Sequence, residues 1–349
     1  MKAEVKPRIE LEGRTRLETV IPIGTPFTVF IDPSNLCNFG CTFCPTGSRG
    51  LIRSTGRKQT NMGFDLFKKV IDDLGQFDGK VKVARLYKDG EPMLNPKFAE
   101  MIGYAKRSAR VERVDSTTNG SFLEPETNRR IVDAGLDRLN ISIEGMSGQV
   151  YRDFARWDLD FDGFVRNIRD LYEHRGQCEI VVKTVAENLK EGERDRFLQI
   201  FGEISDRIFV ENMAPCWPQF DCSHLPASFE VGIYGQPVFE TEVCPYVFYS
   251  MAVNSDGSVS LCFLDWAHRL IIGDVRSQSL REIWEGEEMF CHRRRMLELR
   301  RHEHAVCGRC GQLTHCQPDN IDAYAPALLQ KLLQSRARPG TSSAPPGRE

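Results

Sequence analysis

Three cysteines lie close together in the segment 35–50, which reads NLCNFGCTFCPTGSRG. They are Cys37, Cys41 and Cys44, and no fourth cysteine is near them in the sequence. Three thiolates suit an iron–sulfur cube that keeps one iron free, whereas a structural zinc ion normally takes four closed ligands. The segment therefore predicts a cluster with one iron open to a further ligand.

A second group of cysteines follows in the last third of the chain. Cys244 and Cys262 stand in the pattern C-x12-G-x4-C, and Cys307, Cys310 and Cys316 follow as C-x2-C-x5-C. A pair on a hairpin and a CxxC pair together offer four ligands, which would close one further cluster or hold a zinc ion. Because cytosolic thiols stay reduced, we interpret the 12 cysteines as metal or redox groups and not as structural disulfides.

The elements that must position these cysteines alternate along residues 27–213. Short β-branched runs predict strands, and amphipathic stretches such as 64–75 and 128–135 predict helices between them. The six predicted strands are residues 27–32, 81–87, 113–119, 138–144, 179–185 and 207–212. Six β-then-α units predict an α/β fold with a partial (β/α)6 TIM-like barrel. The first three cysteines then follow the first strand, at the mouth where barrel active sites are built.

The rest of the chain divides by composition. Residues 1–26 form an N-terminal segment, residues 27–213 the barrel and the proline-rich residues 214–236 a connector. Residues 237–325 follow as a small hairpin-plus-helix extension, in which Ser255-Asp256-Gly257 is a hairpin turn and residues 279–301 are expected to form a helix. Residues 335–349 have the composition of a disordered tail.

Charge and hydropathy exclude several classes of function. With 46 Lys and Arg against 49 Asp and Glu, the net charge of −3 gives no basic surface for nucleic acid or an anionic membrane. No apolar run reaches the roughly 18 residues of a membrane span, and residues 1–26 do not read as a signal peptide. We therefore expect a cytoplasmic protein that acts on a small-molecule substrate.

The first cysteine motif resembles that of the radical SAM superfamily, Cys-x3-Cys-x-aromatic-Cys, with Phe43 as the aromatic residue. The resemblance covers roughly residues 27–325. It implies that the three cysteines hold a 4Fe-4S cluster whose free iron binds S-adenosyl-L-methionine, which is cleaved to a 5'-deoxyadenosyl radical. Further family motifs follow successive strands. They imply that the cofactor is bound by Gly90, Glu91, Pro92, Asn119, Ser142 and Glu144.

The second group of cysteines resembles the SPASM or twitch extension of that superfamily, which holds auxiliary 4Fe-4S clusters. Cys244, Cys262, Cys307 and Cys310 match the four ligands of the one-cluster form, and Cys316 competes with the last two. A full two-cluster module expects a cysteine where Asn320 stands. The two-cluster alternative stays open because the chain also carries Cys216, Cys222 and Cys291, although Cys291 lies in a helical run where a buried thiol is commoner. Cys178, beside a strand, is expected to be a packed thiol.

The spacing of the second group is most similar to that of the aminoglycoside-biosynthesis dehydrogenases of the 2-deoxy-scyllo-inosamine type. That resemblance implies oxidation of a secondary alcohol of a sugar or aminocyclitol, with an electron donor such as flavodoxin or ferredoxin. One alternative is an epimerase in which Cys316 or Cys216 returns a hydrogen. Another is a peptide-modifying maturase, which is disfavoured because only 26 residues precede the first strand. A zinc-binding module is the alternative that is not an enzyme.

Overall fold

One continuous sheet forms the centre of the molecule. The computed structural model describes residues 1–218, 220–221, 223–225, 230–316 and 319–337. Within these residues the sheet order is β1-β7-β6-β5-β4-β3-β2-β8-β9-β10. The strands are β1 (Glu4–Val5), β2 (Thr28–Ile31), β3 (Val81–Arg85), β4 (Val111–Thr118), β5 (Arg138–Ile143), β6 (Glu179–Val185), β7 (Arg207–Glu211), β8 (Ser250–Val253), β9 (Ser258–Ser260) and β10 (Ile271–Asp274).

The six strands predicted from the sequence are β2 to β7, and all of them are confirmed. Each pairs in parallel with the next one along the chain, as Thr28 with Val83 between β2 and β3 illustrates. The six strands are largely buried, and such strands favour continuous β-branched runs over strict alternation. The fold is therefore the expected α/β barrel, with the carboxyl ends of the strands on one side.

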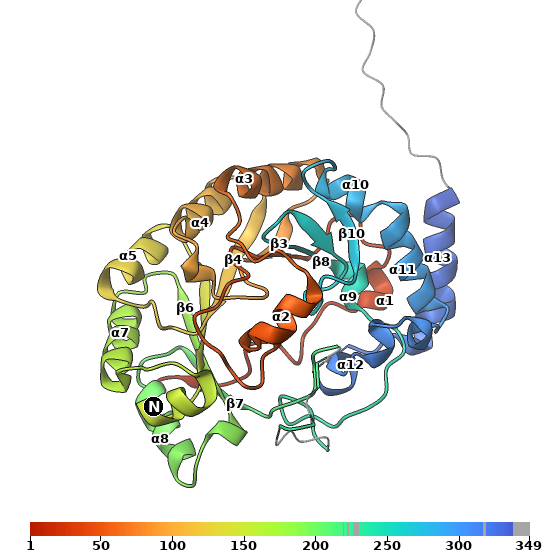
Figure 1. The fold of residues 1–349 in the computed structure, drawn as a ribbon. Coiled ribbons are helices and arrows are strands. Elements are labelled where there is room, and N and C mark those ends of the chain that lie inside the picture. The colour runs from red at the N-terminus through yellow and green to blue at the C-terminus, as the bar shows by residue number, and fades with distance from the viewer. Residues whose placement is uncertain (219, 222, 226–229, 317–318, 338–349) are drawn as a thin grey trace, which may run out of the picture.

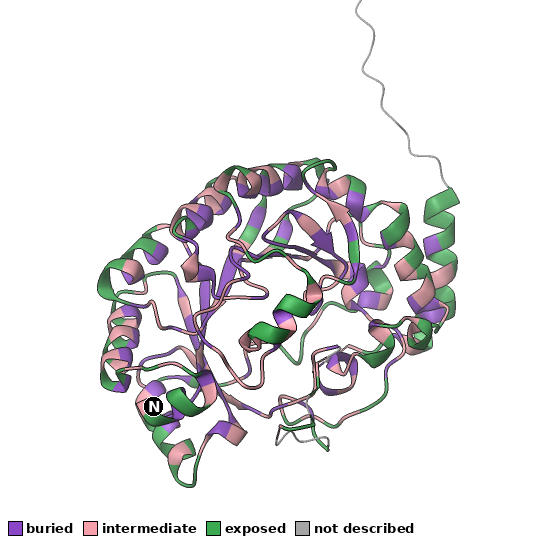
Figure 2. Cartoon of the chain, in the orientation of Figure 1, coloured by how far each residue is buried: buried purple, intermediate pink, exposed green. Residues whose placement is uncertain are grey.

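The helices of the described residues are α1 (Leu17–Val20), α2 (Arg49–Thr55), α3 (Phe64–Asp73), α4 (Phe98–Arg107), α5 (Pro125–Asp133), α6 (Gly148–Val150), α7 (Phe161–Glu173), α8 (Glu193–Phe201), α9 (Tyr246–Tyr249), α10 (Leu280–Trp284), α11 (Glu287–Leu297), α12 (Gln312–His315) and α13 (Ala325–Ala337). Most of the longer ones surround the sheet on its outer side (Figure 1). Helices α3, α4, α5 and α7 turn their apolar faces to the strands, and the purple inner and green outer sides of Figure 2 show this burial. The helix α2, which follows the first cysteines, lies across the face of the barrel seen in Figure 1.

Both edges of the barrel sheet carry strands from outside residues 27–213. The strand β1 pairs in parallel with β7, through Glu4 and Arg207, so the N-terminal segment extends the sheet. A run of two residues has no readable period, and sequence patterns therefore do not predict it. On the other edge β8 pairs in parallel with β2 and antiparallel with β9. The second group of cysteines is thus attached directly to the strand that precedes the first group.

The C-terminal extension matches its predicted hairpin but not its predicted helix. Gly257, with φ of +94°, makes the turn between β8 and β9. Residues 279–301 contain two helices, α10 and α11, and not one. The break falls at Gly286, where a Cβ would come 2.8 Å from the carbonyl oxygen of Glu282. Of the predicted tail, residues 335–337 belong to α13, and residues 338–349 lie outside the described residues.

Candidate iron–sulfur and cofactor site

The first three cysteines lie on a tight loop between β2 and α2. The backbone N–H of Cys44 donates to the carbonyl oxygen of Cys41 at 3.2 Å, and that of Gly47 donates to the carbonyl oxygen of Cys44 at 2.9 Å. A Cβ at Gly47 would overlap the backbone of Cys41, so this turn needs glycine. All three thiols are partly exposed and line one large cavity, together with Phe43. The loop therefore brings together the three ligands that the sequence predicts.

The turn after β3 packs against this loop. The backbone N–H of Glu91 donates to the carbonyl oxygen of Leu36 at 2.8 Å. Gly90 lies so close that a Cβ there would overlap the backbone of residues 34–36. Both Gly90 and Glu91 line the cavity. Pro92 does not line it, and instead begins a short turn over Pro92–Leu94.

Three hydrogen bonds hold the carboxylate of Glu91. It accepts from the backbone N–H of Asn119 at 2.8 Å, from the hydroxyl of Thr118 at 2.8 Å and from the backbone N–H of Met93 at 3.1 Å. Glu91 is only 2% exposed, and burial raises its pKa to about 7 in spite of these bonds. A positively charged ligand at the cavity would favour the carboxylate form. Sequence reasoning missed Thr118, which adjoins Asn119 at the end of β4.

Asn119 reaches the cysteine loop as well. Its side-chain amide lies 3.9 Å from the sulfur of Cys37 and donates to the side-chain oxygen of Asn38 at 2.9 Å. Its own amide oxygen accepts from the hydroxyl of Ser121 at 2.7 Å. Asn119 therefore joins the end of β4 to the first cysteine. Hydrogen bonds to the sulfurs are one of the means by which a protein tunes a cluster.

Two residues predicted from the sequence, Ser142 on β5 and Glu144 in the loop after it, line the same cavity. Ser142 and Glu144 alternate with Ile143, so their side chains point to one side. Glu144 is 6% exposed, and burial raises its pKa, while the charge of Lys183 on β6 acts in the opposite direction. The cavity thus carries a row of polar side chains across the carboxyl ends of β3, β4 and β5.

Four cysteines of the second group lie in the C-terminal extension, namely Cys244, Cys262, Cys307 and Cys310. Burial raises the pKa of Cys307 to about 12, and the charge of Cys310 adds to this shift. Burial likewise raises the pKa of Cys244, with further contributions from Cys307 and Cys310, and that of Cys262, with a contribution from Cys244. The four thiols therefore lie within range of one another's charge, and the thiol of Cys310 also lies 4.0 Å from the carbonyl oxygen of Cys216. The hairpin pair and the CxxC pair are therefore brought together, as the sequence predicts.

The remaining cysteines of the described residues have different surroundings. The sulfur of Cys316 lies 2.9 Å from that of Cys216, and both residues line the large cavity. Cys291 is exposed on α11, so the expectation of a buried thiol is wrong there, because its position on α11 faces solvent. Cys178 is 1% exposed, as expected of a packed thiol. Cys222 lies outside the described residues.

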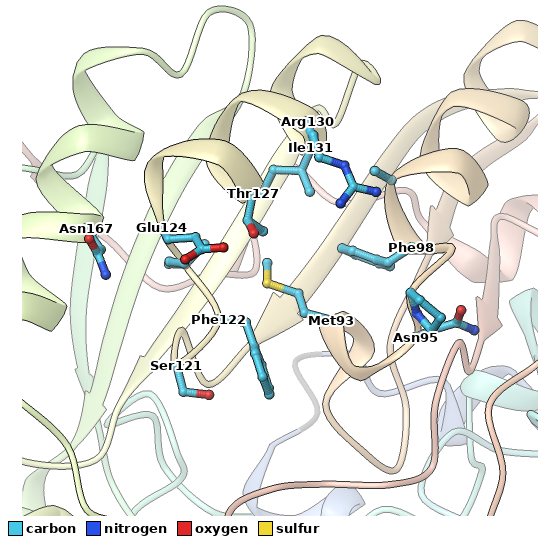
Figure 3. Close-up of a pocket in the computed structure, with 13 residues that line it drawn as sticks. Met93, Asn95, Phe98, Ser121, Phe122, Glu124, Thr127, Arg130, Ile131 and Asn167 are labelled. Carbon is cyan, nitrogen blue, oxygen red and sulfur yellow. The ribbon is translucent and has the colours of Figure 1, made fainter.

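One cavity of about 670 Å³ is lined by the first three cysteines and extends to residues next to the second group, although Cys244, Cys262, Cys307 and Cys310 are not in its lining. Its walls include the first three cysteines and also residues that flank the second group, namely Tyr246, Phe263, Leu264 and Gln312. A smaller cavity of about 290 Å³ lies between α4 and α5 on the outer side of the barrel (Figure 3). The smaller cavity has no cysteine in its lining. Of these two cavities, the larger one is therefore where a substrate would meet the first three cysteines.

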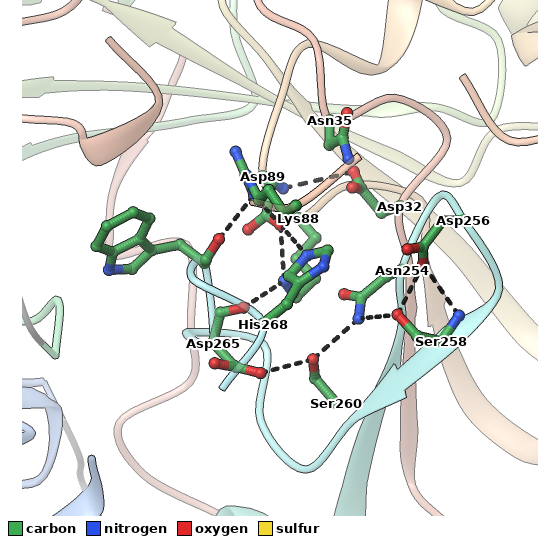
Figure 4. A network of polar contacts seen from close by, with 12 residues as sticks. Asp32, Asn35, Lys88, Asp89, Asn254, Asp256, Ser258, Ser260, Asp265 and His268 are labelled. Carbon is green, nitrogen blue, oxygen red and sulfur yellow. Dashed lines mark hydrogen bonds and ion pairs between the residues drawn. The ribbon is translucent and has the colours of Figure 1, made fainter. Parts of the chain in front are cut away.

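A buried network of charges ties the cysteine loop to the C-terminal hairpin (Figure 4). Lys88 donates to Asp89 at 2.8 Å and to the backbone carbonyl of Asp265 at 3.1 Å. The carboxylate of Asp265 in turn accepts from the hydroxyl of Ser260 on β9 at 2.8 Å. Since these side chains are almost fully buried, the network joins the turn after β3 firmly to the C-terminal hairpin.

Comparison with known families agrees with this arrangement. Residues 31–191 match the family model of the radical SAM superfamily, and residues 244–311 match that of SPASM, an iron–sulfur cluster-binding domain. The chain carries a radical SAM domain followed by a SPASM domain. Its cofactors are accordingly a 4Fe-4S cluster and S-adenosyl-L-methionine, with auxiliary iron–sulfur clusters implied by the SPASM match.

The donor sets of this radical SAM chain fit those cofactors. Within the described residues no three His, Cys, Asp or Glu side chains converge as they would around a single metal ion. A cluster binds each thiolate at a different iron, so its ligands stand further apart than those of one ion. The cavity beside the three thiols leaves room for a ligand, and the buried carboxyl group of Glu91 in its wall suits a cationic one. None of the helices in the described residues is long and apolar enough to cross a membrane.

Individual radical SAM relatives are distant. The chain is 23% identical to the AdoMet-dependent heme synthase of Methanosarcina barkeri, over 83% of this chain and 89% of that protein. It is 29% identical to a probable GTP 3',8-cyclase of Metallosphaera sedula, over 52% of this chain and 54% of that protein. The chain therefore spans about half the length of that cyclase.

Solved structures share the fold. BtrN in complex with AdoMet and 2-DOIA superposes with a TM-score of 0.54 at 16% identity, over 85% of this chain and 97% of BtrN. Native anSMEcpe with bound AdoMet superposes with a TM-score of 0.56 at 14% identity, over 89% of this chain and 98% of anSMEcpe. At these identities the likeness concerns the fold alone.

Proposed function

We propose that this radical SAM enzyme oxidises a secondary alcohol of a small polyhydroxylated ring, a sugar or an aminocyclitol, in natural-product biosynthesis. The single observation that carries the proposal is one cavity whose wall contains the first three cysteines and also residues beside the second group, such as Tyr246 and Phe263. Loss of two hydrogens from an alcohol needs a group that takes a hydrogen atom from carbon, a group that takes an electron, and water or a base that takes the hydroxyl proton. A substrate in this cavity would lie next to the first three cysteines and beside residues that flank the auxiliary cysteines.

The residue roles in this proposal follow from the contacts. Cys37, Cys41 and Cys44 hold the open cluster, and Cys244, Cys262, Cys307 and Cys310 hold the auxiliary one. When bound, the open cluster and S-adenosyl-L-methionine supply a 5'-deoxyadenosyl radical that takes hydrogen from carbon, and the auxiliary cluster supplies a one-electron acceptor.

The chain's own side chains bind the methionine and ribose parts of the cofactor. Glu91 accepts hydrogen bonds from the ammonium group, and its three internal bonds fix the direction of its carboxylate. Ser142 and Glu144 face the ribose hydroxyls from β5 and the loop after it. Asn119 holds Cys37 in place, and Phe43 covers the loop from the cavity side.

The lining of the cavity suits a polar ring. One wall is aromatic, with Phe30 stacked on Phe263 at 4.5 Å between ring centroids. The opposite charges of Arg8 and Glu211 lie 3.0 Å apart, and Lys183 lies 3.4 Å from the same carboxylate. Such a polar group orients hydroxyl or amino substituents, while the aromatic wall excludes water and packs against ring C–H groups.

A second candidate function is epimerisation of a carbon centre on the same class of substrate. The observation that favours it is the thiol pair Cys216 and Cys316 in the cavity wall. In that reaction a thiol S–H bond breaks and a C–H bond forms at the substrate radical. An external one-electron reductant and a proton then restore the thiol.

Several findings support the first candidate. The cysteine spacing resembles that of the aminocyclitol dehydrogenases, and the fold is shared with BtrN, whose crystal structure contains 2-DOIA. The heme synthase and cyclase names of other relatives concern those proteins and point to other radical outcomes on the same framework. We further propose that the enzyme works in the cytoplasm and takes its electron from a flavodoxin or a ferredoxin.

The test is product analysis with the anaerobically reconstituted enzyme. Candidate aminocyclitols are incubated with S-adenosyl-L-methionine and a reductant in deuterated water, and products are identified by mass spectrometry. Oxidation predicts a ketone that is two mass units lighter than the substrate, in equal amount to 5'-deoxyadenosine. An epimer that carries solvent deuterium, without any ketone, would support the second candidate and reject the first.

A further inference from the structure

Two cysteine sulfurs outside the two proposed ligand sets lie in direct contact. The sulfurs of Cys216 and Cys316 lie 2.9 Å apart, although 100 positions separate the residues in sequence. Cys216 belongs to the connector after β7, and Cys316 directly follows α12. The pair therefore joins the barrel to the C-terminal extension.

Backbone contacts hold both thiols in this position. The thiol of Cys216 donates to the carbonyl oxygen of Ala214 at 3.3 Å. The backbone N–H of Cys316 donates to the carbonyl oxygen of Gln312 at 2.9 Å. The carbonyl oxygen of His315 accepts from the backbone N–H of Ile233 at 2.8 Å. Hydrogen bonds with the surrounding backbone therefore hold both cysteines where their sulfurs meet.

We propose that Cys216 and Cys316 form a reversible dithiol–disulfide pair in the wall of the cavity and do not serve as ligands of the auxiliary cluster. Two observations separate the pair from the ligands. The SPASM match ends at residue 311, before Cys316. The four cysteines of the hairpin and the CxxC motif lie within range of one another's charge, whereas the sulfur of Cys316 is in contact with that of Cys216. Cys216 approaches the four through its carbonyl oxygen, which lies 4.0 Å from the sulfur of Cys310.

The chemistry is thiol–disulfide exchange with a small disulfide that enters the cavity. One thiolate attacks the small disulfide, an S–S bond breaks, and a mixed disulfide forms with release of one small thiol. The second thiolate then attacks the mixed disulfide, so the protein disulfide forms and a second small thiol leaves. Closure of the bond needs the sulfurs to approach by about 1 Å, since an S–S bond is about 2.0 Å long.

Closure of the pair would change the cavity in one defined way. The disulfide would link the connector after β7 to the end of α12 and remove both S–H groups from the wall. Reduction would restore them. The pair would thus control whether free thiols line the cavity, whichever product the enzyme makes.

Cysteine mapping of the full-length protein with its clusters bound tests the proposal. The anaerobic protein is treated with 2-hydroxyethyl disulfide, free thiols are blocked with N-ethylmaleimide, and peptides are identified by mass spectrometry. We expect a peptide in which Cys216 and Cys316 are linked, with unchanged iron content, and its loss on treatment with dithiothreitol. Cys291, exposed and without a neighbouring thiol in the described part of the chain, is the internal control and should carry only the mixed disulfide.

Single substitutions complete the test. In Cys216→Ser the mixed disulfide on Cys316 should persist, whereas in the unchanged protein it should be resolved by Cys216. Both Cys216→Ser and Cys316→Ser should keep the iron content of the unchanged protein. The proposal is overturned if the linked peptide is absent, if linkage occurs only with loss of iron, or if either substitution removes about four irons per chain. Because the mapping needs no substrate, its failure would leave the proposed oxidation untouched.

Discussion

Asp89 and His268 meet at 3.1 Å, between a carboxylate oxygen and a ring nitrogen, although 179 positions separate them in sequence. The same carboxylate oxygen accepts from Arg57 at 2.7 Å and from Lys88 at 2.8 Å. Arg57 follows α2, and His268 lies between β9 and β10. One buried carboxylate therefore fixes the segment after the first cysteines against the C-terminal extension (Figure 4).

Replacement of Asp89 should destabilise the whole protein. In Asp89→Asn the cations of Arg57 and Lys88 stay buried without their carboxylate, which costs about 3–5 kcal/mol of unfolding free energy for a broken buried pair. Urea unfolding followed by circular dichroism measures this change. Asp65→Asn is the matched control, because Asp65 pairs with Lys68 in solvent and its loss should leave the midpoint unchanged. Equal midpoints for the two variants would contradict the role given to Asp89.

Replacement of a first-loop cysteine should abolish radical formation. In Cys41→Ala we expect a loss of about four irons per chain and no release of 5'-deoxyadenosine under reductant. Iron analysis and chromatography of the nucleoside products measure the two effects. Cys291→Ala is the control, since that exposed thiol should affect neither. Nucleoside release by Cys41→Ala at the rate of the control would remove the basis of the proposed function.

Replacement of two auxiliary cysteines should separate the two parts of the reaction. The double variant Cys262→Ala, Cys310→Ala should also lose about four irons per chain, because the auxiliary group would have only two ligands left. The first loop would be intact, so 5'-deoxyadenosine should still form, while the ketone should fall below a tenth of its level in the unchanged enzyme. Full iron content in the double variant would show that these two cysteines do not both serve as ligands.

Much of this site follows from the sequence because its parts are local. The strands β2 to β7 are short β-branched runs, and the three cysteines, Gly90-Glu91 and Asn119 each follow a strand directly. Parallel strands bring their carboxyl ends to one edge, so residues after successive strands must meet. The turn at Gly257 is equally local, because Asp-Gly tolerates the backbone that a hairpin needs.

The parts that the sequence does not predict depend on long-range contacts. The strand β1 has two residues and exists only because β7 offers an edge. The pair of Cys216 and Cys316 depends on how the connector packs on α12. The partners of Asp89 come from three separate segments, and each of them alone reads as an ordinary surface charge. The hydrophobic periodicity and the composition of a segment do not indicate which distant segments will contact one buried carboxylate.

Glu91 should contribute directly to cofactor affinity. Glu91→Gln keeps the size of the side chain but loses the charge, and a hydrogen bond to a charged group contributes about 1.5–3 kcal/mol. We therefore expect the dissociation constant of S-adenosyl-L-methionine to rise by roughly 10- to 100-fold. Calorimetric titration of the anaerobic enzyme measures it. Glu100→Gln, on the outer helix α4, is the control, and equal affinities in the two variants would argue against the role of Glu91.

The affinity for S-adenosyl-L-methionine should also depend on pH with a defined sign. Burial raises the pKa of Glu91 to about 7, so the unbound protein carries the neutral acid below that pH. Binding of an ammonium group requires the carboxylate, and the affinity should rise by about tenfold per pH unit on the acid side and level off above pH 7. Above about pH 8 the affinity should fall again as the α-amino group of the ligand loses its proton. Calorimetry from pH 5.5 to 8.5 should find that the acid limb disappears in Glu91→Gln, and an acid limb that persists in this variant would assign the titration to another group.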